Sequence, residues 1–230
     1  MDTLSSPRVA DVLTALFDDA VTADQSMAQK SDDVLIDDDM MSWAIAEERR
    51  DYKAFYQSYP GNYWCIAPEF GRLLYVLARA CGARRIVEFG TSFGVSTIHL
   101  ASALRDAGGG GKVITTEIVP EKSARARQNL AAAGLDDLVE FRVGDALETL
   151  QDGFDGPVDL LLLDGAFSLY HPVLRLVEPY LRPGSLVLGE NALETAGPFL
   201  DYVRDPANGY AGLTLPFEPS RGNHLAVRTG

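Results

Sequence analysis

Acidic residues recur at one kind of position in this chain, the end of a short apolar run. They are Glu88, Glu117, Asp145, Asp164 and Glu190, and Asn191 follows the last of them. A carboxylate is costly to bury without a partner, so this regular placement predicts groups that a ligand or a cation satisfies. Carboxylate and amide oxygens can accept hydrogen bonds from hydroxyl groups or coordinate a divalent cation.

The apolar runs alternate with segments of helix length from residue 85 onward. "RIVEFG", "KVITTEI" and "VDLLLLD" are followed by "VSTIHLASALRDAG", "PEKSARARQNLAAAGL" and "SLYHPVLRLVEPYLRPG". This alternation predicts an α/β fold with a doubly wound, mostly parallel sheet of seven strands, in which the last two runs form an antiparallel hairpin. Ligands of such sheets bind beyond the carboxyl ends of the strands, so the acids should gather at the binding edge.

A turn with two glycines follows the first apolar run. In "EFGTSFGVS", Gly90 and Gly94 lack side chains that would keep a ligand away from the backbone amides. The spacing is not the full GxGxxG of a dinucleotide site. Glu117 could accept hydrogen bonds from two ribose hydroxyls, or it could be a solvated charge at a strand end. Asp145 could lie at an adenine edge, cap the helix "ALETL", or do both.

Five motifs in order carry a resemblance to a known family. "VEFGTSFGVST", "TTEI", "VGDALETL", "LLLLDGAFSLY" and "LGEN" resemble those of the class I S-adenosylmethionine-dependent methyltransferases, specifically the cation-dependent O-methyltransferases of the catechol and caffeoyl-CoA type. The resemblance implies a Rossmann-like fold and methyl transfer to a hydroxyl of a small aromatic, catechol-like or natural-product substrate. It assigns to the cofactor Glu88, Gly90, Thr91, Ser92, Gly94, Ser96, Glu117, Ile118, Asp145, Ala146 and Asp164.

The same resemblance implies a divalent cation at the ends of the fourth and fifth strands. The matching residues are Asp164, Glu190 and Asn191. Three oxygen ligands suit Mg²⁺, which keeps part of its hydration and would lower the pKa of a bound substrate hydroxyl. The family commonly has aspartate where this chain has Glu190, which is longer by one methylene.

The general base is where the chain departs most from the family. A lysine usually follows the strand-four acid by three residues, and Phe167 stands there. A phenyl ring cannot take a proton, but it could stack on an aromatic substrate or pack under the next helix. Tyr170 and His171 could replace the base beside Asp164, although His171 could also be a solvated or capping histidine. The expected substrate contacts are Trp64, Phe167 and Tyr170.

Residues 1–67 precede the core at 68–230, and we expect both to form one methyltransferase domain. Apolar spacing predicts a helix from Pro7 to about Met27, then an acidic loop over 31–40 and a helix over 40–60. An apolar set in this segment could wall a flat substrate, cover the cofactor, or form core or dimer contacts. Its members are Met40, Met41, Trp43, Tyr63 and Trp64. We expect a lid segment and a homodimer.

The composition argues against several partners. With 33 Asp plus Glu against 20 Lys plus Arg, the net charge of −13 disfavours nucleic acid. No apolar stretch is long enough to span a membrane, and no leader pattern is visible, so we expect a cytoplasmic protein. Cys65 and Cys81 show no metal-ligand spacing.

Two alternative functions stay open at this stage. An NAD(P)-dependent oxidoreductase would share the fold and Glu117, but no Tyr-x-x-x-Lys pair is visible. A cofactor-binding protein with altered or lost, metal-independent chemistry is suggested by Phe167 and Glu190.

Overall fold

The computed structural model describes the backbone of residues 2–30, 38–192, 197–216 and 222–230, and their side chains apart from those of 25–30 and 38–41. Residues 31–37 of the expected acidic loop and the side chains of Met40 and Met41 therefore lie outside the described residues. The rest of that loop, from Asp38, is already helical.

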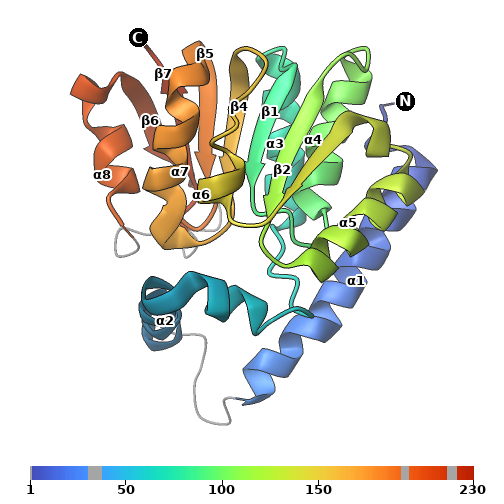
Figure 1. Ribbon diagram of the computed structural model, residues 1–230. Helices are drawn as coiled ribbons and strands as arrows, with labels where there is room; N and C mark the ends of the chain where they lie inside the picture. Colours follow the sequence, from blue (N-terminus) through green and yellow to red (C-terminus); the bar gives the residue numbers. More distant parts are fainter. Residues whose placement is uncertain (1, 31–37, 193–196, 217–221) are drawn as a thin grey trace.

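One seven-stranded sheet forms the centre of the molecule, in the order β3-β2-β1-β4-β5-β7-β6 (Figure 1). The strands are β1 Arg85–Phe89, β2 Lys112–Glu117, β3 Val139–Val143, β4 Val158–Leu163, β5 Leu181–Gly189, β6 Tyr210–Thr214 and β7 His224–Arg228. The first five are parallel, and β7 runs antiparallel to both of its neighbours. The predicted parallel sheet with an antiparallel terminal hairpin is confirmed.

Helices cover both faces of the sheet. The helices are α1 Pro7–Lys30, α2 Asp38–Gln57, α3 Pro68–Ala80, α4 Val95–Asp106, α5 Pro120–Ala133, α6 Ala146–Thr149, α7 Tyr170–Val177 and α8 Phe199–Arg204, with short 3-10 turns η1 Asp136–Leu138, η2 Phe167–Leu169, η3 Glu178–Tyr180 and η4 Pro206–Asn208. Residues of α1, α3, α4 and α5 share one hydrophobic cluster, and residues of α6, α7 and α8 share another.

The leucines of β4 separate these two clusters. All six residues of the strand are buried. Leu160 and Leu162 belong to the cluster with α3 and α4, whereas Leu161 and Leu163 belong to the cluster with α7. Successive side chains of a strand point to opposite faces, so each leucine meets a helical layer, which stabilises the fold by roughly 1.5–3 kcal/mol for each buried side chain. The strand pattern thus fixes where Asp164 emerges.

The predicted helix over 168–184 is wrong in its second half. The regular helix ends at Val177, η3 follows, and β5 begins at Leu181. Pro179, in η3, lacks the N–H that a continuing helix needs. Pro183, two residues after the start of β5, lacks it as well.

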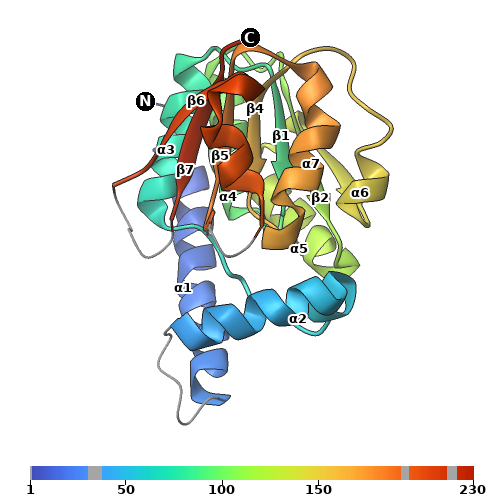
Figure 2. The same cartoon turned by 90° about the vertical axis from the view of Figure 1, so that its left-hand side faces the viewer.

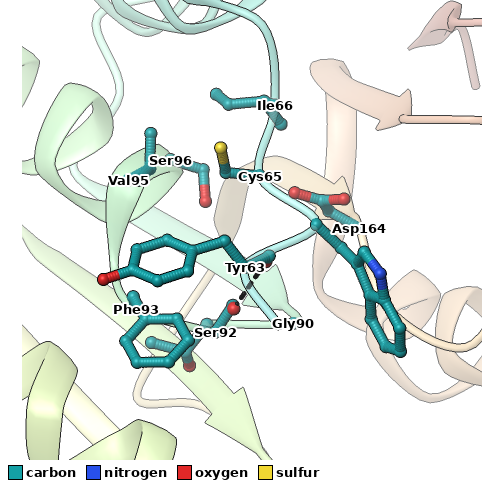
Figure 3. Close-up of a pocket in the computed structure, with 11 residues that line it drawn as sticks. Tyr63, Cys65, Ile66, Gly90, Ser92, Phe93, Val95, Ser96 and Asp164 are labelled. Carbon is teal, nitrogen blue, oxygen red and sulfur yellow. Dashed lines mark hydrogen bonds between the residues drawn. The ribbon is translucent and has the colours of Figure 1, made fainter. Parts of the chain in front are cut away.

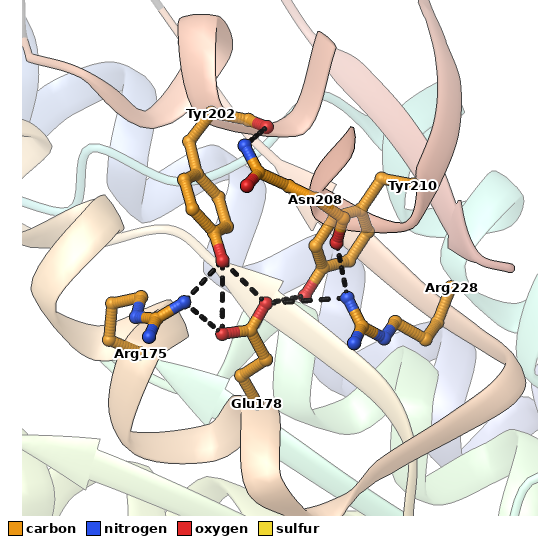
Figure 4. Close-up of polar contacts among 6 residues, drawn as sticks. All are labelled: Arg175, Glu178, Tyr202, Asn208, Tyr210 and Arg228. Carbon is orange, nitrogen blue, oxygen red and sulfur yellow. Dashed lines mark hydrogen bonds and ion pairs between the residues drawn. The ribbon is translucent and has the colours of Figure 1, made fainter. Parts of the chain in front are cut away.

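A carboxylate ties the antiparallel end of the sheet to α7 and α8 (Figure 4). Glu178 accepts hydrogen bonds from the hydroxyls of Tyr202, at 3.0 Å, and Tyr210, at 2.9 Å. Its carboxylate also pairs with Arg175 and, at 3.4 Å, with Arg228. Four groups, one each from α7, α8, β6 and β7, therefore converge on one acid.

The helix α2 lies across the edge at which the parallel strands end, while α1 runs beside α5 (Figure 2). A kink divides α2 at Asp51, whose φ of −161° and ψ of 84° are not helical. The Asp51 carboxylate accepts a hydrogen bond from the Ala54 N–H at 3.0 Å and so caps the second half. Among the described residues, no helix is long and apolar enough to cross a membrane.

Candidate active site

A cavity of about 430 Å³ lies between α2 and the carboxyl ends of the parallel strands. This volume suits a small-molecule site. The sequence-predicted residues that line it are Trp64, Gly90, Ser92, Glu117, Ile118, Asp145, Ala146, Asp164, Phe167, Glu190 and Asn191. Acids from the ends of β2, β3, β4 and β5 are thus brought to one cavity.

The glycine turn is shaped by close contact between β1 and β4. Gly90 has a φ of +103°, and a Cβ atom there would overlap the backbone carbonyl of Asp164. Only glycine tolerates both conditions. The N–H of Thr91 donates to the carbonyl of Thr116 at 3.0 Å, and the N–H of Ser92 donates to the Glu117 carboxylate at 2.7 Å. The turn is therefore fixed to the end of β2 before any ligand arrives.

A small side pocket of about 20 Å³ extends behind this turn. Ser96, Ser92 and Asp164 point into it, and the Ser92 hydroxyl donates to the carbonyl of Tyr63 at 2.8 Å (Figure 3). Thr91 and Ser96 line this pocket but not the main cavity. Thr91 and Ser96, both predicted to bind the cofactor, therefore line only the side pocket, whereas Gly90 lines both spaces.

Glu88 lines neither space, although the resemblance assigns it to the cofactor. Its carboxylate is fully buried and accepts hydrogen bonds from the hydroxyls of Thr97 and Thr115, both at 2.6 Å. Burial raises the pKa of Glu88 to about 6. Because these partners lie on α4 and β2, Glu88 supports the glycine turn from below rather than facing the cavity.

Glu117 is positioned to accept further hydrogen bonds. One carboxylate oxygen accepts from the Ser92 N–H, and the other accepts from the Val119 N–H at 2.9 Å. Burial raises the pKa of Glu117, and each oxygen keeps a lone pair for a ligand hydroxyl. Gly94, in contrast, starts α4 at a φ of +89° and packs on Leu130, outside the cavity.

Asp145 both lines the cavity and caps the helix that follows it, two features that the sequence analysis allowed together. It lines the cavity, and its Oδ1 caps α6 by accepting from the Leu147 N–H at 2.9 Å. Its Oδ2 accepts from the Tyr52 hydroxyl at 2.6 Å and pairs with Lys53 at 2.7 Å. Burial alone would raise the pKa of Asp145, but the hydrogen bonds from Lys53 and Tyr52 outweigh it and lower the pKa. The helix α2 thus contacts the predicted adenine residue.

The predicted cation ligands end adjacent strands and line the same cavity. The N–H of Asp164 donates to the carbonyl of Phe89 at 2.8 Å, and that of Glu190 donates to the carbonyl of Leu163 at 2.9 Å. Asn191 has a φ of +47°. No group of three His, Cys, Asp or Glu side chains suited to a metal occurs in the part of the chain that is described. A cation here would need the Asn191 amide as its third ligand, and this oxygen donor set suits Mg²⁺.

Tyr170 and His171 do not reach the cavity. Tyr170 is 2% exposed, and its hydroxyl donates to the backbone carbonyl of Glu190 at 2.6 Å. His171 packs against the ring of Tyr202 on α8, with 4.8 Å between ring centroids. Burial lowers the pKa of His171. Because consecutive helical residues point about 100° apart, α7 turns Tyr170 toward the strand ends and His171 away from them. The structure therefore corrects the expectation that either one serves as base or substrate contact.

Four aromatic side chains that line the cavity, those of Trp43, Phe55, Trp64 and Phe167, are called the aromatic wall. Phe55 and Trp64 stack with centroids 6.1 Å apart. Trp64 has a φ of +43°, which is uncommon for a non-glycine residue. Asp24 at the end of α1 holds it there by accepting from the Trp64 N–H at 3.0 Å.

Among the residues near the cavity that sequence reasoning missed are Lys122, Glu48 and Tyr56. Lys122 is 3% exposed, and its Nζ lies 5.1 Å from the ring centroid of Trp64; burial lowers its pKa. Glu48 is 1% exposed and hydrogen-bonds to Tyr56, which lines the cavity. The sequence contains one signal for Glu48. It follows the buried Ile45 by three residues, a spacing that places it on the apolar face of α2.

Comparisons with known proteins find similarity over the strand-end residues of this cavity. Residues 87–192 match the family model of a methyltransferase domain. A catechol O-methyltransferase of Niastella koreensis is 34% identical over 145 residues, which are 62% of this chain and 64% of that protein. A catechol O-methyltransferase of Mycobacterium tuberculosis is 37% identical over 132 residues, 57% of this chain and 59% of that protein. The chain spans less than two thirds of these relatives' length.

Similarity to a solved structure extends over nearly the whole chain. The O-methyltransferase from Bacillus cereus in complex with S-adenosylhomocysteine aligns with a TM-score of 0.65 at 25% identity, covering 94% of this chain and 100% of that one. The Rossmann-like arrangement expected from the sequence is therefore found in a protein that holds the methyl donor's product.

Proposed function

We propose that this chain, whose residues 87–192 match the model of a methyltransferase domain, transfers a methyl group from S-adenosylmethionine to a hydroxyl of a small aromatic molecule. One observation carries the proposal. Gly90, Glu117 and Asp145, which we assign to the cofactor side, line the same cavity as Asp164 and Glu190, which we assign to the reaction side. S-adenosylmethionine supplies the methyl group when bound, and a divalent cation supplies the positive charge that lowers the pKa of a substrate hydroxyl.

The cofactor side is assembled mostly from preformed groups. The turn at Gly90 and Ser92 presents backbone to the methionine end, and Glu117 accepts from the ribose hydroxyls. Asp145 and Ala146 face the adenine. Because the turn and Glu117 are hydrogen-bonded to each other in this structure, little reorganisation opposes binding.

The reaction side binds and orients the substrate. Asp164, Glu190 and Asn191 would hold Mg²⁺, and two vicinal substrate oxygens and a water would take the remaining positions. Tyr170 fixes the carbonyl of Glu190 and so positions that ligand. The aromatic wall favours a flat ring, so a catechol is the simplest substrate that meets both requirements.

The two alternatives from the sequence are not favoured. The similar structure holds S-adenosylhomocysteine rather than a nicotinamide cofactor. The oxygen donors of the cation site are all retained at the cavity, which opposes a loss of chemistry. The homodimer, the cytoplasmic location and the lid role of residues 1–67 stay predictions.

Calorimetric titration with S-adenosylhomocysteine tests the proposal. We expect binding to the wild type and weaker binding to Glu117→Gln, because a neutral amide accepts fewer hydrogen bonds from the ribose. Glu121→Gln is the matched control, since Glu121 is exposed at the start of α5 and does not line the cavity. Mg²⁺ should strengthen the binding of catechol to this complex and should fail to do so in Asp164→Asn. Absence of any binding by the wild type would refute the methyltransferase function.

A further inference from the structure

Two residues of α2 lie close to Phe167, the position at which the family has lysine. The Glu48 carboxylate accepts hydrogen bonds from the backbone N–H groups of Phe167, at 3.0 Å, and Ser168, at 2.7 Å. The hydroxyl of Tyr56 donates to Glu48 Oε2 at 2.9 Å. The pair therefore lies directly against the backbone of the residue that would otherwise be lysine.

Tyr56 also lines the cavity, together with Asp164 and Phe167. Its ring meets that of Trp64 edge to face, with centroids 5.8 Å apart. Burial and the neighbouring Glu48 raise the pKa of Tyr56 well above its usual value, and the carboxylate of Asp164 adds to this effect. Tyr56 thus stays protonated and donates to Glu48, while its oxygen keeps lone pairs for a second partner.

The other titratable groups described around the cavity have different assignments. Glu117 and Asp145 lie on the cofactor side, and Tyr52 donates to Asp145. The hydroxyl of Tyr63 points to Asp19 at 3.4 Å, and its ring stacks on Phe93. Lys122 lies over the rings of Trp64 and Phe93, and burial lowers its pKa although the nearby Glu117 carboxylate partly opposes this. Asp164 and Glu190 are the proposed cation ligands.

We propose that Tyr56 takes the proton of the substrate hydroxyl and that Glu48 is its final acceptor. This inference rests on the proposed function. As the substrate O–H bond breaks, its proton passes to the Tyr56 oxygen while the proton of Tyr56 moves to Glu48 Oε2. The substrate oxygen keeps the electron pair and forms a bond to the methyl carbon, and the carbon–sulfur bond breaks with its pair on sulfur. The negative charge of Glu48 and the positive charge of the sulfonium disappear together, so no tyrosinate has to form.

The test compares two substrates that differ in the ionisation of the reacting hydroxyl. Catechol is protonated at mildly alkaline pH, whereas 4-nitrocatechol is already ionised and needs no base. Tyr56→Phe removes the hydroxyl and keeps the ring. We expect this variant to lower kcat for catechol about 100-fold, the usual contribution of a positioned base, and to lower kcat for 4-nitrocatechol less than about threefold.

Tyr59→Phe is the matched control. Tyr59 is another tyrosine of the same segment, it touches Phe55 and Trp64, and it does not line the cavity. Both of its rates should equal those of the wild type. Titration with S-adenosylhomocysteine shows whether Tyr56→Phe keeps its fold.

The outcomes separate this inference from the proposed function. If the wild type methylates both compounds and Tyr56→Phe slows both equally, Tyr56 only positions the site and the proton transfer is refuted; the same holds if it slows neither. Glu48→Gln is a second test, because the amide keeps the side-chain length but cannot accept the proton. Like Tyr56→Phe, it should lower kcat for catechol much more than kcat for 4-nitrocatechol. If the wild type methylates neither compound, the proposed function itself is wrong.

Discussion

Replacement of Gly90 by alanine should damage both the fold and the cofactor site. Gly90 has a φ of +103°, beyond the left-handed region that other residues occasionally adopt, and this strain costs roughly 1–2 kcal/mol. A Cβ atom would also overlap the Asp164 carbonyl and lie 3.1 Å from the Gly165 Cα, both backbone atoms that cannot rotate away. Such overpacking costs a further 1–3 kcal/mol or so. The total loss in the free energy of unfolding is about 3 kcal/mol.

Gly82→Ala separates the two contributions. Gly82 follows α3 with a φ of +63°, and a Cβ atom there would meet nothing within 4 Å. This variant should lose only about 1 kcal/mol, the cost of the left-handed conformation. Urea unfolding gives both values. Because β1 and β4 must separate in Gly90→Ala, this variant alone should also bind S-adenosylhomocysteine at least about tenfold more weakly, the effect of 1.4 kcal/mol. Equal stabilities and equal affinities for the two variants would refute the close contact described between Gly90 and Asp164.

Three further predictions concern positions away from the glycine turn. Glu178→Ala should lower the free energy of unfolding by about 3 kcal/mol, because it removes the carboxylate that Tyr202, Tyr210 and two arginines share; the exposed Asp152→Ala should change it by less than about 0.5 kcal/mol. Glu88 has a pKa raised by burial to about 6, so the folded state favours its protonated form, and its contribution to stability is present below about pH 4.5 and lost as pH rises through about 6. As pH rises between these values, the free energy of unfolding of Glu88→Gln should therefore increase by about 2 kcal/mol relative to that of the wild type, as measured by urea titrations. A difference that does not change with pH would contradict the raised pKa. Asn191→Ala should weaken the Mg²⁺ dependence of catechol binding and leave S-adenosylhomocysteine affinity unchanged, and an unchanged Mg²⁺ dependence would remove Asn191 from the cation site.

The sequence determined the strand ends well because their pattern is local. The leucines of β4 and the acid after them specify a doubly buried strand that ends at the binding edge, and the structure places Asp164, Glu117 and Asp145 at one cavity. The glycine turn was equally predictable from the sequence, because only glycine suits a positive φ next to the backbone of another strand.

The helix positions around the cavity were less predictable because they depend on rotation about an axis and on distant partners. The short turn η2 sets the direction of α7, and this turn decides that Tyr170 is buried under Glu190 while His171 faces Tyr202. Glu48 and Tyr56 precede Phe167 by more than a hundred residues, and only the tertiary fold brings them together. Periodicity offered a signal that Glu48 lies on the apolar face of α2, which the sequence analysis did not use, and no local pattern identifies the backbone amides that bind its carboxylate.

The most direct test of the central claim is methyl transfer itself. Purified protein would be incubated with catechol, Mg²⁺ and S-adenosylmethionine that carries a deuterated methyl group. The products would then be identified by mass spectrometry. We expect monomethylated catechol with the label on oxygen and a stoichiometric amount of S-adenosylhomocysteine, both strongly reduced by EDTA and by Asp164→Asn. If S-adenosylhomocysteine binds but no catechol-type hydroxyl is ever labelled, the cavity binds the cofactor without the proposed chemistry, and the central claim is contradicted.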